Sequence, residues 1–166
     1  MKDERQTAEK NKQALSLKSM YFNRYLIVRY ATALFFFTNL YWLAALILSQ
    51  SVWLVVPAAL LISLIASMAE QVKIYSNHTN DAAYTRLAFR ALQITNLLLL
   101  VPAAFTPLFS QVYPFLASET PAQLFIFLLL TAGIGLSTLM LRRLNKIRTN
   151  EDKHYQRIQQ YEEVLN

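Results

Sequence analysis

The 166-residue chain has no cysteine and only two glycines, Gly133 and Gly135, which both lie inside an apolar segment. The absence of cysteine excludes disulfides, a thiol nucleophile and a thiolate metal site. With glycine confined to that segment, a glycine-rich phosphate-binding loop is excluded as well. The two histidines, His78 and His154, have no metal-ligand companions at suitable spacing. We therefore expect no catalytic residues, no cofactor and no metal, and we expect that the protein is not an enzyme.

Charge is also scarce, because charged residues make up 16% of the chain and hydrophobic residues 55%. The apolar residues form long blocks rather than the single stripe of a soluble amphipathic helix. Each block approaches or exceeds the roughly 18–20 residues that cross about 30 Å of hydrocarbon. The sequence thus predicts an all-α membrane protein whose bundle, residues 30–141, contains four transmembrane helices at about 30–48, 52–69, 87–105 and 122–141.

The connections between the blocks indicate how the helices follow one another. Only Ser49, Gln50 and Ser51 separate the first two blocks. A single helix through both, of about 40 residues, would be about 60 Å long, twice the hydrocarbon thickness, so a tight hairpin is favoured. The connection before the fourth block is apolar and rich in proline, and we expect it to lie against the outer leaflet. Thr120 and Pro121 predict the N-cap and first turn of the fourth helix.

The positive charges predict the orientation of the spans. Of the 16 Lys and Arg residues, seven precede the first span, three lie between the second and third, and six follow the fourth. Positive residues are enriched in cytoplasmic loops, so both termini are expected in the cytoplasm of a bacterial plasma membrane. The net charge of +6 then indicates contact with anionic lipid headgroups rather than nucleic acid. The leader of 29 residues is too long for a cleaved signal peptide.

Both polar tails are predicted to be helical. Residues 1–29 form a basic N-terminal segment that should be cytoplasmic. Residues 142–166 lack glycine and proline, so the fourth helix is expected to continue into the tail. Apolar residues recur there at the spacing of a coiled coil, interrupted at Glu151 and His154. This spacing predicts a helix that docks a membrane protein partner or a second copy, with Ile147, Ile158, Tyr161 and Leu165 as the docking residues. The alternative is an amphipathic tail that folds onto the N-terminal helix or the bilayer.

Uncharged polar residues inside the spans are the remaining candidate sites. Asn39 lies near the middle of the first span, and Gln93 and Asn96 share one face of the third. An amide in hydrocarbon needs a hydrogen-bonding partner, so these residues either join helices or line a polar path. Small residues at steps of four, which allow helices to approach closely, occur at Ser63, Ser67, Gly133 and Ser137.

The stretch from Tyr21 to Trp42, YFNRYLIVRYATALFFFTNLYW, resembles small four-helix membrane proteins of Gram-positive bacteria. Some proteins of this kind carry the label of a cellobiose transporter subunit of the sugar phosphotransferase system. The resemblance covers the first span and its leader and includes no functional motif. A soluble phosphocarrier is not supported, because neither His78 nor His154 lies in the setting that such a protein needs.

Two functions fit these features. The first is a non-enzymatic accessory or scaffold protein that docks partners through its cytoplasmic helices. The alternative is a small oligomeric transporter or channel subunit in which Asn39, Gln93 and Asn96 form a polar lining.

Overall fold

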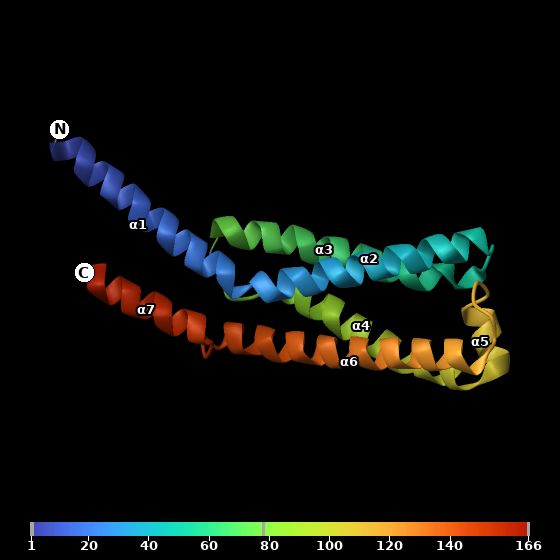
Figure 1. Cartoon of the computed structure of the whole chain (residues 1–166). Coiled ribbons are helices and arrows are strands. Elements are labelled where there is room, and N and C mark those ends of the chain that lie inside the picture. The colour runs from blue at the N-terminus through green and yellow to red at the C-terminus, as the bar shows by residue number, and fades with distance from the viewer. Residues whose placement is uncertain (1, 78, 166) are drawn as a thin grey trace.

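The computed structural model shows an elongated helical bundle with a helical extension at each terminus (Figure 1). It describes residues 2–77 and 79–165, with the side chains of 2–7, 9, 10, 14, 75–77, 106, 162, 164 and 165 left out of the description. In chain order the elements are α1 (Lys2–Arg24), α2 (Leu26–Leu48), the 3₁₀ turn η1 (Val52–Leu54), α3 (Val55–Asn77), α4 (Ala83–Ala104), α5 (Thr106–Val112), α6 (Thr120–Arg148) and α7 (Lys153–Leu165).

Four of the described helices, α2, α3, α4 and α6, are long and apolar enough to cross a membrane. No strand occurs among the residues that the structure describes. Large apolar side chains such as Ile62, Leu98 and Leu128 are exposed on the outside of the bundle, which suits lipid rather than water. The chain is therefore an all-α, multi-pass integral membrane protein with helical extensions, as the sequence predicted.

The two ends of the bundle differ. α1, α7 and the α3–α4 loop lie at one end, which we call the terminal end (Figure 1). The α2–α3 turn and α5 lie at the other end, which we call the hairpin end. Every segment that carries Lys or Arg in the sequence thus meets at the terminal end.

The α2–α3 connection is the predicted tight hairpin. After the end of α2, Gln50 lies in the left-handed region at φ 52°, and the N–H of Ser51 donates to the carbonyl of Leu46 at 3.0 Å. This pattern closes the carbonyls at the end of a helix. The Ser51 hydroxyl then accepts from the N–H of Trp53 and starts η1.

Two expectations about the helix ends were wrong. The fourth spanning helix does not continue into the tail, because α6 ends at Arg148 and a turn precedes α7. In this turn Asn150 adopts φ 58°, a conformation that Asn tolerates, and the N–H of Glu151 donates to the carbonyl of Lys146. The Asp152 carboxylate accepts from the N–H of Tyr155 at 3.2 Å and caps α7.

The start of α6 also differs from the prediction. The N-cap is Glu119, without a side-chain cap hydrogen bond, and Thr120 is already helical beside the first-turn proline.

The proline-rich connection does not simply lie on the lipid surface. An apolar core at this end contains Phe109 and Val112 of α5 and the adjacent Tyr113, all buried. They pack with Leu99, Ala103, Ile126 and Leu130. α5 therefore closes the hairpin end of the bundle, and exposed rings such as Phe105 remain available to lipid.

Candidate functional sites at the two ends of the bundle

A junction centred on Arg24 holds the terminal end together. The Arg24 side chain, only 1% exposed, lies where α1 meets α2. Its guanidinium donates to both carboxylate oxygens of Asp152, from Nη2 at 2.5 Å and from Nε at 3.1 Å. Such a two-point bond fixes direction as well as distance.

The Arg24 guanidinium also donates to the α3–α4 loop, to α6 and to the α6–α7 turn. Nη1 donates to the Asn80 side chain in the α3–α4 loop at 3.0 Å. Nη2 also donates to the carbonyl of Ile147 and to the side chain of Asn150. The guanidinium carbon lies 4.9 Å from the centre of the Tyr155 ring. One buried cation thus connects α1, α2, the α3–α4 loop, α6 and α7.

A chain of hydrogen bonds joins α2, α3 and α4 close to this junction. Gln71 of α3, buried, donates to the hydroxyls of Thr32 and Ser67, each at 3.0 Å. The Ser67 hydroxyl donates to Thr85, whose hydroxyl donates to Glu70 at 2.8 Å. Each of the five side chains in this network makes at least one hydrogen bond, as buried polar groups require.

Glu70 also fixes the beginning of α4. Its carboxylate accepts the backbone N–H groups of Tyr84 and Thr85 at 3.0 and 2.7 Å. A carboxylate at the N-terminus of a helix satisfies free donors and interacts favourably with the helix dipole. Asn80, which lies shortly before α4, accepts from Arg24 instead of capping this helix.

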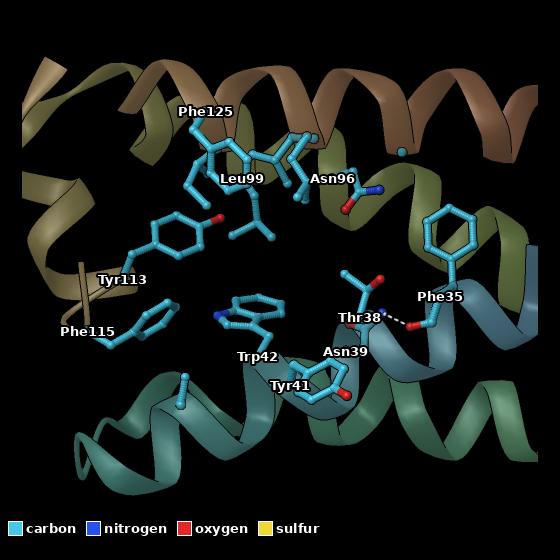
Figure 2. A pocket seen from close by; sticks show the side chains of 15 residues that line it. Phe35, Thr38, Asn39, Tyr41, Trp42, Asn96, Leu99, Tyr113, Phe115 and Phe125 are labelled. Carbon is cyan, nitrogen blue, oxygen red and sulfur yellow. Dashed lines mark hydrogen bonds between the residues drawn. The ribbon is translucent and has the colours of Figure 1, made fainter. Parts of the chain in front are cut away.

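The three amides predicted from the spans have different surroundings. Gln93 donates to the hydroxyl of Thr138 at 2.8 Å and so links α4 to α6. Asn39, 6% exposed, donates to the carbonyl of Phe35 in its own helix. No hydrogen bond to Asn96 is described, and its amide points into a cavity (Figure 2).

The small residues predicted at helix contacts also differ from one another in their burial. Ser67 and Ser137 are fully buried, whereas Ser63 is half-buried and bonds to the carbonyl of Leu60 in its own helix. A Cβ added at Gly133 would lie 2.5 Å from Nδ2 of Asn96. Gly133 therefore makes room for that amide.

The cavity lies within the spanning part of the bundle, toward the hairpin end (Figure 2). It has a volume of about 310 Å³, and residues of α2, α4, α6 and the segment after α5 line it. Asn39 and Asn96 lie at one side, and Trp42 and Tyr113, with rings 6.0 Å apart and stacked, lie at the other. Two residues predicted as a polar lining are thus brought together, and Gln93 is not among the lining residues.

The predicted docking residues of the tail are largely covered within the chain. Ile147 and Ile158 are 0% and 1% exposed, and α7 packs along α1. Tyr161 is half-buried, and the side chain of Leu165 lies outside the described residues. Ile147 and Ile158 would have to leave the core before a partner could touch them, so the docking surface predicted from the heptad spacing needs revision.

Arg24, Gln71, Thr85 and Asp152 were missed by sequence reasoning. A local signal existed for Asp152, since the sequence Thr149–Asn150–Glu151–Asp152 is rich in residues that end and cap helices.

Comparison with protein-family models, with curated proteins and with solved structures found no match for this chain.

Proposed function

We propose that this protein is a non-enzymatic accessory protein of a bacterial plasma membrane, with both termini in the cytoplasm. It presents α1 and α7, together called the terminal arm, as a preformed docking surface for a protein partner. The Arg24 junction carries this proposal, because it attaches the arm to the bundle through a buried charge with partners in the α3–α4 loop, α6 and the α6–α7 turn. A surface that is ordered before binding loses less conformational entropy when the partner arrives.

The distribution of charge supports the orientation. The terminal end collects the segments that contain all 16 Lys and Arg residues, and positive loops are retained in the cytoplasm.

Leu15 is the best candidate contact on the arm. Among the arm's described side chains it is the one large apolar group that is exposed, at 65%. Exposed polar residues of α7, such as Gln159, lie on the other helix of the arm.

Site-specific photocrosslinking in native membranes tests the docking surface. The photoreactive amino acid benzoylphenylalanine would replace Leu15 or Gln159, and Leu48, which is 86% exposed at the hairpin end, would serve as the control position. We expect discrete protein adducts from the two arm positions and their loss when Asp152→Ala weakens the junction. Identical adducts from Leu48, or adducts that persist unchanged in Asp152→Ala, would contradict the proposal.

The cavity gives some support to the alternative, a small transporter subunit. A channel, however, needs a continuous path, and buried Val28, Leu64, Phe89 and Leu92 fill the terminal half of the bundle. Flux of ions and sugars into proteoliposomes would have to be found before this function replaced the first.

A further inference from the structure

We propose that the cavity at the hairpin end binds an uncharged, bilayer-soluble molecule that carries a carbonyl oxygen on a hydrocarbon body. The proposal rests on the position, the size and the unpaired polar groups of the cavity.

The cavity is accessible from lipid. Its wall combines buried residues, such as Phe35 and Leu99, with residues that are exposed on the outside of the bundle, including Tyr41 at 74% and Phe125 at 62%. These exposed side chains belong to α2 and α6, so the outer faces of both helices contribute to the wall. A molecule therefore enters from the hydrocarbon phase.

The size and character of the cavity restrict the ligand further. Small-molecule sites have volumes of about 300–1,000 Å³, and an apolar cavity of about 150 Å³ already binds benzene. The 310 Å³ found here holds more than a ring. None of the described lining residues carries a formal charge, so a charged headgroup would find no counter-ion.

N–H groups without a hydrogen-bond partner indicate that the ligand carries a carbonyl oxygen. The indole N–H of Trp42 is buried and has no hydrogen-bond partner in the described structure. The Asn96 amide is likewise without a described hydrogen bond and points into the cavity (Figure 2). An amide donor in an apolar cavity is unfavourable without an acceptor, and a carbonyl oxygen on the ligand would satisfy the Asn96 amide, which borders the open space.

Two sources supply this chemistry in a bilayer, a quinone ring and the ester groups of an uncharged glycerolipid. Tryptophan fluorescence distinguishes them, because the chain has only two tryptophans. In a Trp53→Phe background, Trp42 in the cavity wall is the only tryptophan. In a Trp42→Phe background, Trp53 in η1 reports collisions in the bilayer.

The full chain in lipid nanodiscs would be titrated with a decyl-substituted benzoquinone, which quenches tryptophan on contact. We expect saturable quenching of Trp42 and linear, collisional quenching of Trp53. Dioctanoylglycerol would then be added as a competitor. Recovery of Trp42 fluorescence assigns the site to glycerolipid esters, and no recovery assigns it to the quinone. Decane, which lacks a carbonyl, should not compete.

Two glycines of the same helix provide a matched pair of variants. In Gly133→Ala the new Cβ would lie 2.5 Å from Nδ2 of Asn96 and must displace that amide, whereas a Cβ at Gly135 meets nothing within 4 Å. Both changes raise helix propensity alike. We expect roughly tenfold weaker quinone binding in Gly133→Ala and in Asn96→Leu, and unchanged binding in Gly135→Ala.

Equal effects of the two glycine variants, linear quenching of Trp42, or recovery of Trp42 fluorescence on addition of decane would overturn the proposal. None of these results bears on the terminal arm.

Discussion

The attachment of α7 to the rest of the protein depends on Asp152, and Asp152→Ala tests this dependence. α7 has 13 residues, a length at which an isolated helix in water is marginal. Its amides should therefore be protected from hydrogen exchange only while the helix is docked on α1 and held by the Arg24 junction.

The size of the effect follows from the burial of the pair. Removal of one partner of a buried ion pair costs about 3–5 kcal/mol, because the other charge stays buried without compensation. Arg24 is 1% exposed, but the side chain of Asp152 is 10% exposed, and Arg24 keeps its bonds to Asn80, Asn150 and the carbonyl of Ile147. We therefore expect the low end, about 3 kcal/mol, which changes the ratio of docked to undocked α7 by roughly 150-fold.

Hydrogen exchange followed by mass spectrometry measures this ratio directly. In Asp152→Ala the protection of α7 amides should fall by about two orders of magnitude, whereas amides in the middle of α6 should be unchanged. Asp152 also caps α7, and loss of a cap alone costs about 1 kcal/mol. Asp152→Asn keeps an acceptor for the cap and removes the charge, so it separates the two contributions.

Two results would refute this reasoning. If α7 protection in Asp152→Ala stayed within about threefold of the wild type, the pair would not hold the helix. If Asp152→Asn matched the wild type, the cap and not the charge would be responsible.

Three further predictions concern the helix ends. Glu70→Gln should lower the stability of the bundle by about 1 kcal/mol in thermal unfolding in detergent, because it removes the charge at the start of α4. Glu119→Gln is the control and should show no comparable loss, because the Glu119 side chain makes no cap hydrogen bond. Gln50→Gly should raise stability by about 0.5–1 kcal/mol in the same assay, because φ 52° strains glutamine but not glycine. Burial raises the pKa of Tyr25 to about 12 from 10, although Arg24 opposes the shift. The neutral phenol therefore stabilises the folded state fully below pH 10 and loses this effect as the pH rises toward 12, so the stability difference between wild type and Tyr25→Phe should shrink over that range.

The number of spans and the hairpin could be predicted because their signals are local. An apolar block of sufficient length must form its own hydrogen bonds in lipid, whatever the rest of the chain does. The break between α6 and α7 was also encoded locally, by Asn150 and Asp152, but the heptad spacing continues across the turn and concealed it. Spacing reports only which residues would share a face if the helix were continuous.

The Arg24 junction could not be predicted in the same way. Its partners Asn80 and Asp152 lie 56 and 128 residues away in the chain, and a single arginine before an apolar span is ordinarily a headgroup contact. Only the packing of α7 on α1 and the position of the α3–α4 loop bring these acceptors to one point.

Residue type alone does not distinguish the roles of Asn39, Gln93 and Asn96. All three are polar residues within spans, and the sequence gives no reason to separate them. In the folded chain Gln93 meets Thr138, and the polar groups nearer the terminal end, from Thr32 to Glu70, satisfy one another. Asn96 faces an open space instead. An unpaired amide in an apolar environment is unfavourable by a few kcal/mol. A packing residue finds its hydrogen-bonding partner within the protein, whereas a binding residue finds it on a ligand.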